Sequence, residues 1–305
     1  MDTEIKIATR ASPLAIKQCE ILIKLIPHIK TKIIKIESKG DQVQDRSLHE
    51  IGGKGLFVKS LEKTLLENNA DIAVHSMKDM EWKQAKGLKI GAVLERGSRK
   101  DLLIGKWKSF YDLPKNAKIG TSSVRRKAFL LSKRPDLSIS LLRGNVNTRI
   151  NKFNKGEFDA IILAQAGIQR LNLNIQSIEL PEDILLPSAG QGAIAIQYKS
   201  ENKFIQNTLN DINHQITEYE TLAERSFVAH LNGSCSSPIG ASARIKDNKV
   251  FLQGWLSSPN GDYIIKDEIS GFYQDAQNIG KVLANSIIKK KKQSFRFRNE
   301  KYNFS

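Results

Sequence analysis

Cysteine is scarce in this chain of 305 residues, which contains only Cys19 and Cys235. Two cysteines so far apart give no disulfide framework, and the sequence has no zinc-like spacing of cysteine and histidine. Long hydrophobic runs are absent as well, so the sequence predicts no transmembrane helix. The N-terminus shows neither a signal peptide nor an Arg/Ser-rich presequence, and we therefore expect a cytoplasmic protein.

Aromatic residues are also few, at 7% of the chain, whereas the net charge is strongly positive, at +16. Such a charge attracts anions, whether nucleic acid, anionic lipid or a substrate with several acidic groups. A surface that binds nucleic acid interleaves basic side chains with aromatic ones. The low aromatic content therefore argues against nucleic-acid binding, which we keep as a rival class. The sequence contains no phosphate-binding P-loop and no nucleophile elbow.

Most of the positive charge comes from lysine, with 34 lysines against 14 arginines. Guanidinium groups grip carboxylates or phosphates with two parallel hydrogen bonds, which an ammonium group cannot do. The positions that keep arginine in a lysine-rich chain are therefore informative. Six of the 14 arginines fall at predicted junctions between a strand and a helix: Arg10, Arg125, Arg126, Arg143, Arg149 and Arg170.

Strand-like and helix-like segments alternate through the first two-thirds of the chain. The strand-like segments are 4–9, 32–38, 70–76, 117–123, 137–144, 158–164 and 193–199. The helix-like segments are 12–26, with Ser12 as N-cap and Pro13 in the first helical position, then 56–69, 124–134, 146–156 and 165–171. This alternation predicts parallel or mixed sheets in an α/β fold. The polar, glycine-rich segment 40–55 is expected to form a mobile loop.

The pattern changes from about residue 217. A helix is predicted over 218–232, and the alternating segments 239–246, 249–257 and 262–270 predict an antiparallel three-stranded sheet. A last helix is expected over 274–289. Residues 291–305 are rich in lysine and are expected to form a frayed, disordered tail.

The segment "IGTSSVRRK" (119–127) carries the clearest anion-binding pattern. Its hydroxyls and its two arginines meet at the start of a predicted helix, where backbone amides are unpaired. The segments "ATRAS" and "LRGNVNTR" repeat this design, and ligands of doubly wound sheets bind at the carboxyl ends of strands. Each arginine alone is explained more simply by pairing on a solvated surface. The six together predict a ligand with several carboxylates or phosphates.

Three further features carry candidate chemistry. Lys78 and Asp79 directly follow a strand, and a carboxylate in a basic crevice would stay ionised and could stabilise a developing cation. A simple surface pair of these two residues is the alternative, and His75 on the same strand is predicted to be structural. Cys19 is expected to pack in its helix. Cys235, in contrast, lies in the loop "NGSCSSPIG" among small residues.

Taken together, these segments resemble the hydroxymethylbilane synthase (porphobilinogen deaminase) family. The matching pieces run in the family's order over roughly residues 5–243: "IATRASPLAIKQ", "SKGD", "GGKGLFVKSLE", "DIAVHSMKDM", "IGTSSVRRKAFLL", "LRGNVNTRINK", "FDAIILAQAGIQRL", "LPSAGQGAIAI" and "AERSFVAHLNGSCSSPIGA". The resemblance implies three α/β domains. The first two resemble type II periplasmic binding proteins, with mixed sheets flanked by helices, and the third is a small α+β domain with a three-stranded antiparallel sheet. The implied bounds are 1–99 plus 193–215, then 100–192, then 216–290.

The resemblance also implies an activity in porphyrin and heme biosynthesis. A dipyrromethane cofactor is attached to Cys235 through a thioether, and four porphobilinogen molecules condense onto it head to tail with loss of ammonia. Hydrolysis then releases linear hydroxymethylbilane, which passes on to uroporphyrinogen-III synthase. We expect a monomeric transferase with no metal, no nucleic-acid partner and no membrane partner.

The resemblance assigns roles to individual residues. Asp79 is the expected catalytic residue, which hydrogen-bonds pyrrole N–H groups and stabilises the azafulvene-like cation formed as ammonia leaves. Cofactor binding is expected from Cys235, Lys78, Asp79, Thr121, Ser122, Ser123, Arg125, Arg126, Arg143, Gly144, Arg149, Arg170 and Gln191. Substrate binding is expected from Arg10, Ser12, Gln18, Lys54, Arg143, Arg149 and Arg170, under the 40–55 loop as a cover.

The chain departs from the family pattern in two places: Glu81 and Trp82 stand where the family usually has a proline turn, and Ser234 stands in place of a glycine. The local turn after Asp79 is therefore in question. The main rival function is a non-catalytic anion-binding protein of the same two-lobed architecture, which needs neither Asp79 nor Cys235. Covalent modification of the cysteine would separate the two.

Overall fold

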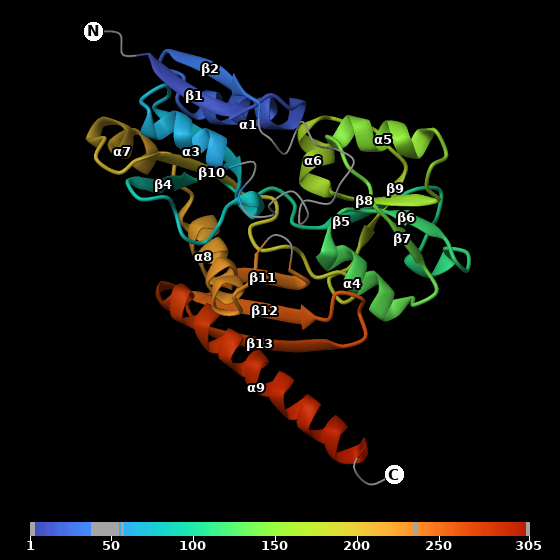
Figure 1. The fold of residues 1–305 in the computed structure, drawn as a ribbon. Coiled ribbons are helices and arrows are strands. Elements are labelled where there is room, and N and C mark those ends of the chain that lie inside the picture. The colour runs from blue at the N-terminus through green and yellow to red at the C-terminus, as the bar shows by residue number, and fades with distance from the viewer. Residues whose placement is uncertain (1–3, 38–54, 56–57, 235–236, 303–305) are drawn as a thin grey trace.

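The computed structural model describes residues 4–37, 55, 58–234 and 237–302 (Figure 1). Lys54, Cys235 and most of the predicted 40–55 loop lie outside these residues. The described chain forms three sheets, of five, five and three strands. No helix within the described residues is long and apolar enough to cross a membrane.

The first sheet is mixed and has the strand order β2-β1-β3-β10-β4. Its strands are β1 (Ile5–Arg10), β2 (Thr31–Ile36), β3 (Ile72–Ser76), β4 (Leu88–Val93) and β10 (Ile194–Lys199). Strand β1 is parallel to β2 and β3, whereas β10 returns antiparallel between β3 and β4. Helices α1 (Pro13–Leu25) and α7 (Lys203–Asn210) share one hydrophobic cluster with the sheet, and α3 (Lys59–Leu66) packs in another.

The second sheet is also mixed, with the strand order β7-β6-β8-β5-β9. Its strands are β5 (Asp101–Ile104), β6 (Lys118–Gly120), β7 (Ser138–Ser140), β8 (Ala160–Ala164) and β9 (Ser177–Leu180). Strand β5 is antiparallel to β8 and β9, and the other pairs are parallel. Helix α4 (Val124–Lys133) packs in one cluster, and α5 (Val146–Asn154) and α6 (Gln165–Arg170) pack in another.

The two mixed sheets are joined by two chain segments that lie side by side. The amide of Gly97 in one segment donates to the carbonyl oxygen of Gly192 in the other, at 3.1 Å. Gly192 has φ +88°, and a Cβ there would lie 2.5 Å from the Gly97 oxygen. Only glycine meets both conditions, so the close approach of the two segments depends on it.

The third sheet is an antiparallel meander of β11 (Ile239–Lys246), β12 (Lys249–Ser257) and β13 (Ile264–Phe272). Helices α8 (Gln215–His230) and α9 (Ala276–Tyr302) share one hydrophobic cluster with it. In Figure 1, α8 lies between this sheet and the first one. The predicted fold class, with two mixed sheets flanked by helices and a small three-stranded antiparallel sheet, is confirmed.

The last helix differs from the sequence-based expectation. The sequence predicted a helix over 274–289 and a frayed tail over 291–305, whereas α9 continues to Tyr302. Residues 291–302 contain no proline or glycine, and lysine, glutamine and arginine are good helix formers. The chain therefore meets no stop signal at residue 290, where the prediction ended the helix.

Candidate active site

A cavity of about 590 Å³ lies between the first two sheets and is open to solvent. Its walls come from the ends of β1, β3 and β8, and from the turns that lead into α1, α4 and α5. Such junctions at the carboxyl ends of strands are where α/β sheets bind ligands. The cavity is lined by all six predicted arginines, which are Arg10, Arg125, Arg126, Arg143, Arg149 and Arg170.

The charge of these arginines is concentrated rather than spread out. Burial, together with the positive charges of Arg126, Arg143 and Arg10, lowers the pKa of Arg149 to about 10, although the charge of Asp79 raises it. Burial likewise lowers the pKa of Arg170 to about 10. Guanidinium groups that repel one another in a partly desolvated cavity favour the binding of an anion with several negative charges.

Arg125 and Arg126 share a buried carboxylate that the sequence analysis did not single out. Asp101 accepts from Arg125 Nη2 at 2.8 Å and from Arg126 Nη2 at 2.7 Å. Each arginine gives its other terminal nitrogen to a backbone carbonyl oxygen, those of Leu186 and Ile162 respectively. Two guanidinium groups around one carboxylate leave an excess positive charge at the cavity wall. The prediction that these two arginines bind ligand carboxylates stays a prediction.

Replacing Asp101 by asparagine is expected to lower the free energy of unfolding by about 3–5 kcal/mol, because it leaves two buried guanidinium groups without their counter-charge. The pKa of Asp101 is lowered to about 2, chiefly by Arg125 and Arg126 acting against burial. Its stabilising contribution is therefore present at neutral pH and is lost as the pH falls toward 2. Urea denaturation of the wild type and Asp101→Asn measures the change.

Glu182→Gln is the matched control for this measurement. Glu182 pairs with Arg244 at 2.6 Å, and the Arg244 side chain is 56% exposed. Removing this exposed pair is expected to cost less than about 1 kcal/mol. Equal losses in the two variants would show that Asp101 contributes no more than an ordinary surface pair.

The hydroxyl groups before α4, which were predicted to bind an anion, partly take part in hydrogen bonds within the protein. Ser123 is the N-cap of α4 and accepts from the amide of Arg126 at 3.4 Å. Thr121 is buried and accepts from the Ser123 amide at 3.1 Å, and it is not among the residues that line the cavity. Ser122 and Ser123 do line it. The segment before α4 therefore offers a ligand two serines rather than three hydroxyl residues.

Gly144 lies just before α5, and Arg149 lies in the first turn of that helix. The carbonyl oxygen of Gly144 accepts from Arg149 Nε at 2.8 Å, which orients the guanidinium group toward the cavity that both residues line. Gly144 has φ +110°, and a Cβ there would lie 2.6 Å from Cγ2 of Thr148. A glycine is therefore required at this turn.

Lys78 and Asp79 follow β3 in a short 3-10 turn, Met77–Asp79, and both line the cavity. Lys78 Nζ donates to Gln191 Oε1 at 3.4 Å, and Gln191 Nε2 donates to Asp101 at 3.0 Å. Gln191 thus connects the predicted catalytic turn with the Asp101 pair. Burial and the charge of Arg126 lower the pKa of Lys78 to about 8, although Asp79 and Asp101 raise it.

Three of the predicted substrate residues, Arg10, Ser12 and Gln18, lie between the end of β1 and the middle of α1. Ser12 is the N-cap and accepts from the Ala15 amide at 3.4 Å, as its sequence pattern predicted. Gln18 is buried in α1, lines the cavity and donates to Ser76 Oγ at 2.8 Å, at the end of β3. Cys19 is fully buried in the core, and burial raises the pKa of its thiol to about 11.

The His75 side chain is uncharged at neutral pH. Burial lowers its pKa to about 4, and its Nε2 lies 3.1 Å from Gln197 Oε1 on the neighbouring strand β10. The ring sits next to the cavity, yet its position and its neutral state agree with the structural role that was predicted for it.

The residues that flank Cys235 lie close to the Asp79 turn. A small hollow of about 60 Å³ is lined by both Lys78 and Asp79 and by Ser234 and Ser237 from the cysteine loop. Ser234 does not have a positive φ, so the serine found in place of glycine fits its backbone without strain. Trp82 lines the same hollow. The described residues on both sides of Cys235 therefore face the predicted catalytic turn.

A buried ion pair, missed by the sequence analysis, connects the segment after β4 with α8 and the third sheet. Arg96 donates to both carboxylate oxygens of Glu224, at 2.8 and 2.9 Å. Glu224 also accepts from the amides of Gly190 and Ala243. Neither Arg96 nor Asp101 could be found from sequence, because each lies in a polar stretch and pairs with residues distant in the chain.

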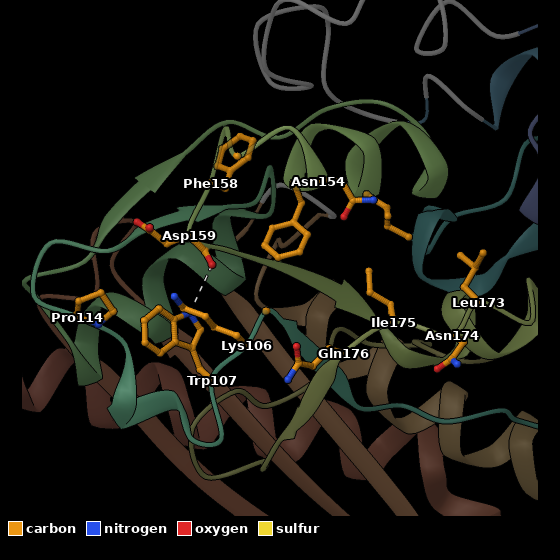
Figure 2. A pocket seen from close by; sticks show the side chains of 14 residues that line it. Lys106, Trp107, Pro114, Asn154, Phe158, Asp159, Leu173, Asn174, Ile175 and Gln176 are labelled. Atoms are coloured by element: carbon orange, nitrogen blue, oxygen red, sulfur yellow. Dashed lines mark hydrogen bonds between the residues drawn. The ribbon is translucent and has the colours of Figure 1, made fainter.

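A second, larger hollow of about 840 Å³ lies beside α5 in the second sheet unit (Figure 2). It shares no lining residue with the arginine-lined cavity, and none of the described arginines lines it. Its wall combines aromatic rings with side-chain amides, and the Trp107 indole donates to the Asp159 carbonyl oxygen at 3.4 Å. It therefore lacks the strong positive charge of the arginine-lined cavity.

The fold and the cavity together define an α/β protein of a ligand-binding class, with a strongly basic cleft between two mixed sheets. Comparison with known sequences identifies the family. The model of the family "Porphobilinogen deaminase, dipyromethane cofactor binding domain" matches residues 5–207, and that of "Porphobilinogen deaminase, C-terminal domain" matches residues 219–289. The chain belongs to the porphobilinogen deaminase family, as the sequence motifs indicated.

Curated relatives agree with the family models over most of their length. The chain is 45% identical over 291 residues to a porphobilinogen deaminase of Buchnera aphidicola subsp. Acyrthosiphon pisum (strain Tuc7), covering 93% of each chain. It is 44% identical over 297 residues to that of Campylobacter concisus (strain 13826), covering 94% of this chain and 95% of the relative. Among solved structures, a probable amino-acid ABC transporter extracellular-binding protein of Bacillus subtilis aligns at 15% identity and TM-score 0.41, over 74% of this chain and 97% of that one.

Proposed function

We propose that this chain is a hydroxymethylbilane synthase, which condenses four porphobilinogen molecules head to tail and releases linear hydroxymethylbilane. One observation carries the proposal beyond family membership: six arginines, one at the end of β1 and five from the turns and helices around the second sheet, line a single cavity together with Asp79. Porphobilinogen carries an acetate and a propionate, so a chain of such units is a polyanion. Guanidinium groups that repel one another provide the charge which that polyanion needs.

The cavity also suits a resident dipyrromethane cofactor. The Nε atoms of Arg125 and Arg126 are buried and have no hydrogen-bond partner among the described residues, which is costly unless a ligand supplies an acceptor. Gly144 lines the cavity at a turn that requires glycine. When bound through Cys235, the cofactor would supply the pyrrole end to which the first substrate unit is joined. The residues that would hold it are Lys78, Asp79, Ser122, Ser123, Arg125, Arg126, Arg143, Gly144, Arg149, Arg170 and Gln191.

Asp79 is the residue that we assign to the chemistry. Its carboxylate lines the cavity at the end of β3 and lies within electrostatic range of Arg149. It accepts hydrogen bonds from pyrrole N–H groups and faces the positive charge that develops on the substrate as ammonia departs. A fixed carboxylate in a partly desolvated cavity stabilises such a charge more strongly than water does. Arg10, Ser12 and Gln18 bind the substrate from the α1 side.

The activity is tested by incubating the purified protein with porphobilinogen. We expect four ammonia molecules to be released for each linear tetrapyrrole, which is detected as uroporphyrin after cyclisation and oxidation. Tight binding of porphobilinogen without release of ammonia would instead favour the rival, a non-catalytic anion-binding protein.

The protonation state of Lys78 leads to a separate prediction on the pH dependence of ligand binding. Its pKa of about 8 means that its ammonium group loses its proton just above neutral pH, so that a bound carboxylate loses a partner. We expect the affinity for porphobilinogen, measured by calorimetry in Cys235→Ser protein, to fall as the pH rises from 7 to 9. The sign follows because an anion binds best to the protonated form.

Lys78→Arg is the control for this measurement, because a guanidinium group keeps its charge over the whole range. Its affinity should change little between pH 7 and 9. If Lys78→Arg and the parent protein weaken in parallel, the titrating group lies elsewhere.

The domain limits, location and partners complete the proposal. We place the domains at 1–99 plus 193–215, at 100–192 and at 216–290, which the three separate sheets and their hydrophobic clusters support. The protein acts in the cytoplasm as a monomer and passes its product to uroporphyrinogen-III synthase. Size-exclusion chromatography with light scattering tests the monomer.

A further inference from the structure

Arg225 on α8 is a buried arginine that the proposed chemistry does not use. It donates to three backbone carbonyl oxygens of a single turn: Nη1 to Met80 at 3.1 Å and to Met77 at 3.4 Å, and Nη2 to Glu81 at 2.7 Å. Its guanidinium carbon also lies 5.9 Å from the centre of the Trp82 ring. These contacts cross from the third sheet unit to the first.

The turn that Arg225 grips contains Lys78 and Asp79. The oxygens of Met77 and Met80 lie on either side of these two residues in the chain, so the guanidinium group fixes both ends of the short segment. The turn is also held by the Met80 amide, which donates to the Met77 oxygen at 3.1 Å, and by the Met77 amide, which donates to the Ala193 oxygen at 3.1 Å. Arg225 adds side-chain hydrogen bonds to the carbonyl oxygens on both sides of Lys78 and Asp79. The planar fork of arginine suits several oxygens at once, which a lysine ammonium does less well.

The helix that carries Arg225 is itself firmly held. The preceding residue, Glu224, is fully buried and accepts from Arg96, Gly190 and Ala243. Helix α8 then leads into the loop that contains Ser234 and Ser237, which line the same small hollow as Arg225 and Asp79. Arg225 therefore connects helix α8, which is firmly held, to the turn that contains Lys78 and Asp79.

We propose that Arg225 is a positioning residue, which clamps the turn through its carbonyl oxygens and so holds Lys78 and Asp79 at the cavity. The inference rests on the proposed function, because its catalytic readout is turnover of porphobilinogen. Arg225 binds backbone rather than ligand. Its loss should therefore lower kcat far more than it raises KM, since misplacing Asp79 acts on the transition state, whereas misplacing Lys78 removes one of several groups that bind the substrate carboxylates.

The test compares Arg225→Ala and Arg225→Lys with the wild type, and uses Arg244→Ala as the matched control on β11. We expect Arg225→Ala to lower kcat on the order of 100-fold with KM changed less than about threefold. Arg225→Lys, which keeps the charge but not the fork, should recover roughly a tenth of wild-type kcat. Arg244→Ala should remain within about twofold, because its pair with Glu182 is exposed.

Amide hydrogen exchange supplies a readout that does not depend on activity. In Arg225→Lys the amides of residues 77–82 should exchange faster, while those of β3 keep their wild-type protection. Arg225→Lys also replaces Arg225→Ala if the alanine variant does not fold. Unchanged exchange in 77–82, wild-type kcat in a folded Arg225→Ala, or a raised KM at constant kcat would each overturn the proposal.

The two proposals can fail separately. If the wild type releases no ammonia from porphobilinogen, the proposed function fails, and the exchange measurement still decides whether Arg225 clamps the turn. If the wild type is active and the Arg225 variants match it in kcat and in exchange, only the positioning role is lost.

Discussion

Asp79→Ala is expected to give a folded protein whose kcat for porphobilinogen is lower by on the order of 10²–10³. The effect is large because a fixed charge aimed at a developing charge is among the strongest contributions to catalysis. Asp79 lines the same cavity as the six arginines. Its negative charge raises the pKa of Arg149, which the neighbouring arginines lower. Its loss would leave the positive charge on the substrate next to the six arginines without this carboxylate.

The measurement needs steady-state kinetics together with a check of folding. Circular dichroism and the melting temperature should stay close to those of the wild type, since Asp79 is only half-buried. Asp79→Asn keeps the size of the side chain and removes its charge, so it should lose nearly as much activity as Asp79→Ala. If Asp79→Asn kept wild-type kcat, the carboxylate charge would have no catalytic role. Asp112→Ala, at an exposed position on another turn, is the matched control.

Cys235→Ser is expected to abolish both cofactor attachment and turnover. Intact-mass measurement of the wild type from a host that produces porphobilinogen should show the polypeptide plus one dipyrromethane, and the variant should show the polypeptide alone. The cause is chemical, because the hydroxyl of serine is a much weaker nucleophile than a thiolate at neutral pH. Wild-type protein without any added mass, purified from such a host, would contradict the assignment.

The other cysteine supplies the control for this experiment. Cys19 is fully buried, and its pKa of about 11 keeps it as the unreactive thiol at neutral pH. Cys19→Ala should therefore keep the added mass and most of the activity, with only a loss of packing. An added mass that persisted in Cys235→Ser and disappeared in Cys19→Ala would move the attachment site.

Much of the fold could be predicted where local signals are strong. Ser12 and Pro13 mark the start of α1, and the structure begins the helix at Pro13. Strict alternation predicted the three-stranded sheet. Strands β4, β5 and β9 were not predicted. The four-residue segments β5 and β9 carry too little pattern to be told from loops, and pairing across the sheets decides all three strands.

The candidate site was predictable in its arginines but not in what holds them. Arginine at strand–helix junctions of a lysine-rich chain indicated a common cavity, and the six side chains do line one. Asp101 was missed because its partners, Arg125 and Arg126, follow more than twenty residues later and meet it only in the folded state. Arg225 was missed because a single arginine within an amphipathic helix looks like a surface residue.

The contact between Gly97 and Gly192 has a consequence for how this chain could be rearranged. Because the segment between them leaves and re-enters at nearly the same point, its two ends are already joined in space. The segment is therefore an insertion between two points that are already in contact. Replacing it with a short linker should leave the first sheet intact, with β10 still paired with β3 and β4. The segment carries five of the six arginines, which are Arg125, Arg126, Arg143, Arg149 and Arg170. A chain without this segment would keep Asp79 and lose nearly all of its affinity for acidic ligands.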